Sequence, residues 1–212
     1  MITSNKGSSG GARYLILETC SESEAKNPQS PRYASGVSER KRHTIEELKT
    51  IERHPIYVLL DNIRSVYNVG SIFRTSDAAL IKKLYLTGYT PHPPRKDIEK
   101  TALGAIESVP WEYHKNPVDI IKELKEKNVK IIALEITDDS IPYYEIKPED
   151  FPLCLVIGNE ITGISDEVLS MCDLAIEIPQ FGIKHSLNVA VAYGIAVYEL
   201  VKIYRTSHAS VK

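Results

Sequence analysis

The sequence contains few cysteines and no long hydrophobic run. Cys20, Cys154 and Cys172 are its three cysteines, and their spacing shows no pairs, which argues against a disulfide framework and against a zinc site. No stretch approaches the roughly 18 apolar residues that a membrane span needs, and the apolar run at 14–17 is too short for a signal peptide. We therefore expect a cytoplasmic protein with no membrane association and no bound metal ion.

The short motifs of several large enzyme classes are also missing. The chain has no Gly-x-Gly-x-x-Gly after a strand, no Gly-Lys-Ser/Thr of a P-loop, no His-Glu-x-x-His and no nucleophile elbow. Its net charge of −2 gives no general attraction to polyanions. Any nucleic-acid partner must therefore be bound by a local cluster of positive charges, or by a surface shared across a dimer.

The composition that remains is that of one ordinary folded domain with a tail. The chain has 212 residues, of which 42% are hydrophobic and 25% charged, typical of a globular α/β protein. Residues 1–43 are rich in Ser, Gly, Asn and Lys, and we expect them to form a flexible N-terminal tail. Thr44 and Glu47 match a capping box that opens a helix at 44–52, so we expect a folded domain over residues 44–212.

Beyond residue 55 the hydrophobic pattern alternates between short apolar runs and helical periods. We predict strands at 56–60, 83–86, 130–134, 153–157 and 174–178. We predict helices at 69–79, 117–127, 165–171 and 186–204. Continuous apolar strands separated by helices indicate an α/β fold, with a parallel sheet that has helices on both faces.

The last predicted helix is apolar around almost all of its first turns. Leu187, Val189, Val191 and Ile195 point in different directions around a helix, so more than one side must be buried. This pattern suits a helix that packs against its own sheet and against a second subunit.

Three polar strings that carry glycine follow predicted strands. They are NVGSIFRT at 68–75, IGNEITG at 157–163 and IPQFGIKHSLN at 178–188. The carboxyl ends of parallel strands are where α/β proteins place their sites, so each string is a candidate.

The first string offers a helix N-terminus with a cation one turn further on. Free amides and Gly70 suit the close approach of an anionic or sugar-phosphate group, and Arg74 projects from the same helical face. The alternative is structural: Asn68 caps the helix and Arg74 pairs with a surface carboxylate.

In the second string, Gly158 and Gly163 bracket the carboxylate of Glu160, and Ser165 is positioned to cap the next helix. Gly158 would let a ligand lie against the backbone. The alternative is an ordinary strand-to-helix turn in which Glu160 is solvated.

In the third string, Ser186 is a natural N-cap for the last helix, with Asn188 in the first turn. Amides that the cap does not use could bind a ligand carboxylate or an adenine edge. A purely structural cap is the commoner use of such a serine.

Taken together and in this order, the strings resemble the three motifs of the SpoU (TrmH-like) branch of the SPOUT RNA 2'-O-ribose methyltransferases. The match spans 56–204, and the segments 87–94 and 100–111 resemble a subset of that family. The resemblance implies a SPOUT fold with a C-terminal trefoil knot, a homodimer, S-adenosyl-L-methionine as cofactor, and tRNA or rRNA as substrate.

The family's functional positions can be carried over residue by residue. The resemblance assigns ribose-site roles to Arg74, Asn68, Glu160, Ser186 and Asn188. It assigns cofactor contacts to Leu134, Ile157, Gly158, Gly163, Ile178, Gln180, Ser186 and Leu187. Arg74 would act either as the activating base or as an electrostatic positioner of phosphate and oxyanion; a guanidinium stays protonated at neutral pH and is a poor base.

Some features depart from the family or leave its function open. Gln180 stands where the family commonly has Met, and the loop at 181–185 is particular to this chain. Candidate RNA contacts are Arg64, Lys82, Lys83, Arg95, Lys96, Lys100 and the basic run at 40–43. The alternatives are a base-nitrogen methyltransferase of the same fold, a non-catalytic RNA-binding module, and an unknotted nucleotide-binding enzyme.

Overall fold

A computed structural model describes residues 43–208 of the chain. The helices in this range are α1 (Ile45–Thr50), α2 (Val66–Ala78), α3 (Lys96–Ala102), α4 (Ala105–Ser108), α5 (Pro117–Glu126), α6 (Asp166–Leu169) and α7 (Val189–His208), with short 3-10 helices η2 (Tyr143–Glu145) and η3 (Pro148–Asp150). The strands are β1 (His54–Asp61), β2 (Ile81–Thr87), β3 (Trp111–His114), β4 (Lys130–Leu134), β5 (Ile141–Pro142), β6 (Leu153–Ile157) and β7 (Leu174–Glu177). The flexible tail predicted for 1–43 lies outside the described residues except for His43.

The strands form one seven-stranded sheet in the order β3-β2-β1-β6-β4-β7-β5, with every neighbouring pair parallel. The chain runs outward from β1 to β2 and β3, and returns to place β6 on the other side of β1. Leu60 pairs with Ile157, so the loops that follow β1 and β6 begin side by side. Ligands of parallel α/β sheets bind at such a point, beyond the carboxyl ends of the strands.

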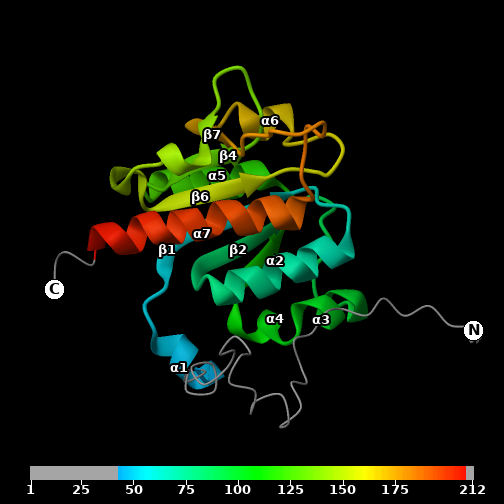
Figure 1. Cartoon of the computed structure of the whole chain (residues 1–212). Helices are drawn as coiled ribbons and strands as arrows, with labels where there is room; N and C mark the ends of the chain where they lie inside the picture. The colour runs from blue at the N-terminus through cyan, green and yellow to red at the C-terminus, as the bar shows by residue number, and fades with distance from the viewer. Residues whose placement is uncertain (1–42, 209–212) are drawn as a thin grey trace, which may run out of the picture. The chain divides into compact units, whose positions relative to one another are not determined.

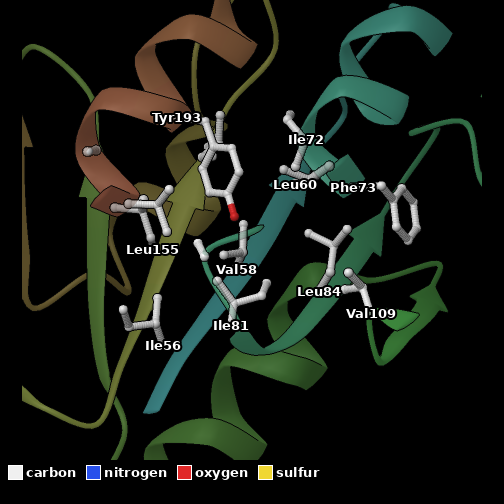
Figure 2. Close-up of a cluster of buried hydrophobic side chains, with 14 of the residues drawn as sticks. Ile56, Val58, Leu60, Ile72, Phe73, Ile81, Leu84, Val109, Leu155 and Tyr193 are labelled. Carbon is white, nitrogen blue, oxygen red and sulfur yellow. The ribbon is translucent and has the colours of Figure 1, made fainter. Parts of the chain in front are cut away.

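Helices cover both faces of the sheet, as predicted (Figure 1). On β1, Val58 and Leu60 belong to the core that α2, α3 and α7 share, whereas Leu59 belongs to the core beneath α5 and α6. This alternation follows from the two-residue period of a strand. Figure 2 shows the first of these cores, with Tyr193 of α7 pointing between the sheet and Ile72 of α2.

The predicted boundaries agree well for the central strands and less well at helix starts. The strands at 130–134 and 153–157 are β4 and β6 with the predicted ends. The helix at 69–79 begins earlier, at Val66, because Ser65 is its N-cap. The capping box of Thr44 and Glu47 is present in α1. The elements α3, α4, β3 and β5 were not predicted.

The helix predicted at 186–204 is α7, and its start differs for a clear reason. The side-chain oxygen of Asn188 accepts hydrogen bonds from the amides of Ala190 (2.9 Å) and Val191 (3.3 Å). Asn188 therefore caps the helix, and the prediction that Ser186 is its N-cap was wrong. An Asn oxygen satisfies free first-turn amides as well as a Ser hydroxyl does.

One long side of α7 is buried and another is exposed within a single chain. Tyr193, Ala196, Val197, Leu200 and Val201 pack against β1, α2 and the sheet. Tyr193 also shares a 2.7 Å hydrogen bond with Ser76 of α2. None of the helices among residues 43–208 is long and apolar enough to cross a membrane.

Candidate active site

A pocket of about 400 Å³ lies at the carboxyl edge of the sheet. Its walls come from the loops that follow β4, β6 and β7 and from the first turn of α7. Its lining includes all eight residues predicted to contact a cofactor: Leu134, Ile157, Gly158, Gly163, Ile178, Gln180, Ser186 and Leu187. Segments from three parts of the chain thus form one concave surface.

Glu160 connects the second string to the first. Its carboxylate accepts hydrogen bonds from the backbone amides of Arg64 (2.8 Å) and Ser65 (3.0 Å) and from Nδ2 of Asn68 (2.8 Å). Burial raises the pKa of the Glu160 carboxyl, but these hydrogen bonds more than offset it, and the pKa lies below its ordinary value. Glu160 is therefore an ionised anchor for the N-terminus of α2, where a helix favours negative charge.

Asn188 connects the third string to the same point. Its Nδ2 donates to Oδ1 of Asn68 at 3.2 Å, while its own Oδ1 caps α7. Asn68 thus donates to Glu160 and accepts from Asn188. The alternative that Asn68 caps α2 is contradicted, because Ser65 occupies that position.

The loop at 158–164, which we call the anchored loop, contains a residue that sequence reasoning missed. Asn159 is buried, and its Nδ2 donates to the carbonyl of Asn62 (2.8 Å) and to the hydroxyl of Tyr89 (2.7 Å). Its Oδ1 accepts from the amides of Ile161 (2.8 Å) and Thr162 (3.1 Å). An Asn between Gly158 and Glu160 was visible in the sequence, but nothing in the string indicated its distant partners.

A second missed residue, Asp61, is fully buried at the end of β1. Its Oδ2 accepts from both the amide (2.9 Å) and the hydroxyl (2.7 Å) of Ser165. Ser165 is the N-cap residue of α6, as predicted, but its side chain makes no capping hydrogen bond because it is bound to Asp61. The serine instead ties the end of the anchored loop to β1.

Two glycines have packing roles that were not predicted. A Cβ at Gly158 would overlap the backbone of Gly163 and Ile164, so this glycine permits the anchored loop to fold onto itself. A Cβ at Gly70 would overlap Thr101 and Ile98 of α3. Gly70 therefore allows α2 and α3 to pack closely, rather than offering backbone to a ligand.

The loop at 178–187, which we call the open loop, is exposed from Phe181 to Leu187. Gln180 donates from Nε2 to the carbonyl of Ile178 at 2.7 Å. The Ser186 hydroxyl has no hydrogen-bond partner within the described residues, although Ser186 lines the pocket. This side of the pocket carries polar groups that are not already satisfied by the protein.

Arg74 lies on the exposed face of α2 and does not line the pocket. Within residues 43–208 its guanidinium makes no hydrogen bond and no ion pair. The alternative that Arg74 pairs with a surface carboxylate is therefore contradicted. The structure brings Asn68, Glu160 and Asn188 together beside Ser186, and leaves Arg74 two turns along α2 from that cluster.

Other nucleophilic or titratable side chains are structural. Cys154 is buried in β6, and burial raises the pKa of its thiol, as expected for a packed side chain. His54 bonds the carbonyl of Ala79 at 2.8 Å at the start of β1, away from the pocket. Among the described residues, no group of three His, Cys, Asp or Glu side chains is arranged to hold a metal ion.

Known proteins resemble this chain in both sequence and structure. Residues 55–198 match the family model described as the SpoU rRNA Methylase family. The tRNA (guanosine(18)-2'-O)-methyltransferase of Aquifex aeolicus is 33% identical over 164 residues, which cover 77% of this chain and 76% of that protein. The crystal structure of the A. aeolicus TrmH/SpoU tRNA modifying enzyme superposes with a TM-score of 0.69 at 31% identity, covering 78% of this chain and 82% of that one.

Two further relatives are longer than the region they share with this chain. The tRNA (guanosine(18)-2'-O)-methyltransferase of Escherichia coli is 31% identical over 144 residues, covering 67% of this chain and 61% of that protein. An AdoMet-bound rRNA methyltransferase from Sinorhizobium meliloti superposes with a TM-score of 0.65 at 31% identity, covering 76% of this chain and 60% of that one. The family model covers more than half of the sequence and all three polar strings, so this chain belongs to the SpoU methylase family.

Proposed function

We propose that this chain is an S-adenosyl-L-methionine-dependent methyltransferase that modifies a ribose 2'-hydroxyl of tRNA or rRNA. The observation that carries the proposal is the hydrogen-bonded chain from Glu160 through Asn68 to Asn188, which joins all three family motifs at one pocket. The named activities of the A. aeolicus and E. coli relatives support the ribose 2'-oxygen as acceptor.

The pocket suits this cofactor in size and in chemistry. Its volume of about 400 Å³ falls within the range of small-molecule sites, roughly 300–1,000 Å³. Leu134, Ile157 and Ile178 provide an apolar wall for an adenine ring, while Glu135 and Glu177 place negative charge where a cationic ligand would lie. When bound, the cofactor supplies an electrophilic methyl group on a positively charged sulfur. The AdoMet-bound S. meliloti structure supports the assignment.

We assign the ribose-facing rim to Asn68, Glu160 and Asn188. Because Glu160 is ionised and accepts three hydrogen bonds from α2 and the residues before it, it holds the helix N-terminus at a fixed position over the pocket. Asn188 fixes the start of α7 against Asn68, the asparagine that also binds Glu160. The hydroxyl of Ser186 is free to bind the nucleotide or the cofactor. Such positioning alone contributes several kcal/mol to a transfer reaction.

We propose that Arg74 acts as a cation rather than as a base. It makes no ion pair with any described residue, so its charge is available to an RNA phosphate. A guanidinium does not lose its proton at neutral pH, but it stabilises negative charge on the 2'-oxygen as that oxygen gives up its proton to solvent or to a phosphate.

We further propose that this chain forms a homodimer through α7. Val191, Ile195 and Tyr198 recur at four- and three-residue intervals in α7, so they form one exposed stripe that is largely apolar, and the exposed Leu187 lies just before the helix. The stripe lies opposite the buried side of the helix, and a second subunit would cover it. A second copy is the partner that the family resemblance implies.

The trefoil knot, the domain boundary and the location also remain proposals. Family membership supports threading of the segment after β7 through the loop region that precedes it. The capping box at Thr44 supports a domain that begins there. A cytoplasmic location is proposed because a reducing compartment suits unpaired cysteines such as Cys154.

The decisive experiment uses the full-length chain with S-adenosyl-L-methionine carrying a labelled methyl group and total tRNA or rRNA. Nuclease digestion followed by mass spectrometry should yield a 2'-O-methylated nucleoside. A base-methylated nucleoside would replace the proposal with the base-nitrogen alternative. RNA binding without methyl transfer, and without cofactor binding in calorimetry, would establish the non-catalytic alternative.

A further inference from the structure

The loop at 87–94 carries exposed aromatic side chains to the edge of the sheet where the pocket opens. We call it the aromatic loop. It follows β2, which pairs with β1, so it begins beside the residues that lead into α2. This loop resembles a segment of the family, but it supplies no residue to the pocket lining or to the Glu160 cluster.

Tyr89 is the residue of this loop that stands out. Its side chain is 61% exposed, yet the residue is held at both ends. Its hydroxyl accepts from Nδ2 of Asn159 at 2.7 Å, and its backbone amide donates to Oδ1 of Asn62 at 3.1 Å. The ring is therefore fixed in place with much of its apolar surface in water.

Hydrogen bonds also hold the backbone around the aromatic loop in place. The hydroxyl of Thr90 donates to the carbonyl of Leu60 (3.1 Å) and accepts from the amide of Ile63 (3.0 Å). Gly88 has a left-handed φ of +64°, and a Cβ there would overlap the side chain of Asn62. A ring held this firmly loses little conformational entropy when it binds a flat partner.

A second aromatic pair supports the same surface. The rings of His92 and Tyr113 lie 4.3 Å apart, and the hydroxyl of Tyr113 donates to the carbonyl of Gly88 at 2.8 Å. Tyr113 is itself partly exposed. The aromatic surface thus continues from the aromatic loop onto the end of β3.

Exposed cations lie in the segments next to this surface. Arg64 is exposed, and its backbone amide is one of the donors to Glu160. Asn159, which binds Tyr89, immediately precedes Glu160 in the chain. Arg95 and Lys96 are exposed directly after the aromatic loop, and neither makes an ion pair within the described residues. Tyr89 is therefore one hydrogen-bonded residue away from Glu160 of the proposed ribose site, and exposed cations stand close in the chain to the residues that build both positions.

We propose that Tyr89 is a substrate-positioning residue on whose ring an unpaired RNA base stacks, with Arg64 binding an adjacent phosphate. The inference rests on the proposed function and names the form of substrate: a nucleotide whose base is out of its helix. Single-stranded bases are recognised by stacking on aromatic rings, combined with positive charges along the backbone. A base inside a duplex has no free face for such a ring.

The test compares two substitutions of Tyr89 in the full-length chain. Tyr89→Phe keeps the ring and removes the hydroxyl that binds Asn159, whereas Tyr89→Leu removes the ring. Tyr144→Leu, which replaces an exposed tyrosine of η2 that does not line the pocket, is the matched control. The dissociation constant for a fluorescent, unstructured oligoribonucleotide is measured together with the KM for RNA and the dissociation constant for S-adenosyl-L-methionine.

We expect Tyr89→Leu to raise both the dissociation constant for the oligonucleotide and the KM for RNA by about 5- to 100-fold. This factor corresponds to the stacking free energy of one base. Cofactor affinity should be unchanged, and Tyr144→Leu should behave as wild type. Tyr89→Phe should lose clearly less RNA affinity than Tyr89→Leu, because it keeps the stacking ring and loses only the hydrogen bond to Asn159. A duplex RNA of equal length should bind equally well to all variants. Wild-type RNA affinity in Tyr89→Leu would overturn the inference, and so would equal losses in the Phe and Leu variants, because the hydroxyl anchor alone would then explain them.

The oligonucleotide measurement needs no methyl transfer. If the wild-type chain methylates no RNA but Tyr89→Leu still loses oligonucleotide affinity, the proposed function fails and the stacking inference stands. If the wild type methylates RNA and Tyr89→Leu binds the oligonucleotide normally, the proposed function stands and the stacking inference fails.

Discussion

The anchored loop and the open loop face each other across one pocket but are built in opposite ways. In the anchored loop, Asn159 alone accounts for four side-chain hydrogen bonds, and the ends of the loop pair with each other through Asn159 and Gly163. In the open loop, Phe181 and Ile183 are 98% and 92% exposed. One wall of the pocket is therefore preformed, whereas the other has few internal contacts.

This difference indicates a division of labour. The preformed wall positions α2 and the groups proposed to face the ribose, since a transfer reaction requires fixed geometry. The open wall has unsatisfied polar groups and exposed apolar side chains, which suit a segment that gains its contacts when a cofactor or a second subunit binds. The predictions below test this division, starting from the largest effect.

Replacing Arg74 by Ala should abolish methyl transfer while leaving both walls of the pocket intact. Methyl transfer should fall about 100-fold or more, as on loss of a group that stabilises developing negative charge. Cofactor affinity should be nearly unchanged, because Arg74 does not line the pocket. Calorimetry and initial rates measure the two quantities, and Arg74→Lys is the control that keeps the charge. Full activity in Arg74→Ala would remove this residue from the proposed mechanism.

Glycine substitutions compare the two loops directly. Gly158→Ala would force its Cβ into the backbone of Gly163 and Ile164, whereas a Cβ at Gly182 of the open loop meets nothing within 4 Å. Gly158→Ala should lower the free energy of unfolding by about 1–3 kcal/mol and weaken cofactor binding. Gly182→Ala should change neither. Thermal unfolding and calorimetry provide the comparison, and similar effects of both substitutions would contradict the division between the loops.

Glu160→Gln should weaken the anchored wall in a pH-dependent way. The pKa of Glu160 is lowered in the folded protein, so its stabilisation is complete above the unfolded pKa, near 4.3, and is lost as pH falls through the folded pKa. We expect Glu160→Gln to be less stable than wild type by about 1–2 kcal/mol at neutral pH, because the amide also presents N–H groups to donors.

The corresponding measurement is denaturant unfolding of both proteins from neutral pH into the acid range. The difference between wild type and Glu160→Gln should shrink as the pH falls from the unfolded pKa, about 4.3, through the lower folded pKa. A difference that stays constant with pH would show that the ionised carboxylate is not what stabilises the N-terminus of α2.

The smallest expected effect is a change in dynamics alone. Hydrogen exchange of the free protein should already be slow at Asn159 and Gly163, whose amides are hydrogen-bonded to each other's carbonyls. Addition of S-adenosyl-L-methionine should slow exchange mainly within residues 180–187. Greater protection of the anchored loop than of the open loop would show that the preformed wall had been assigned to the wrong side.

Local sequence patterns predicted the secondary-structure elements better than the contacts between them. The ends of β4 and β6 followed from apolar runs, and the second and third strings identified most of the pocket lining. The errors occurred where two residue types can do the same local task. Ser186 and Asn188 are both good helix caps, and the choice depends on Asn68, which lies 120 residues earlier and binds Asn188.

Buried polar residues with distant partners were the ones that sequence reasoning missed. Asp61 and Asn159 each stand at the end of a strand, where a polar residue attracts no notice. Their partners, Ser165 and Tyr89, are 104 and 70 residues away. Only the pairing of β1 with β6 and with β2 brings these groups within hydrogen-bonding distance.

The sequence by itself determined the α/β class, the sheet edge that carries the site and the family of the chain, because these depend on hydrophobic periodicity and on motifs that are continuous in the sequence. Tertiary structure alone decided that Glu160 holds the start of α2, that Gly158 serves the fold of its own loop, and that Tyr89 is fixed beside the site. Each of these depends on a distance between residues far apart in the chain, and such distances arise only when the parallel strands pair and bring their carboxyl ends to one edge.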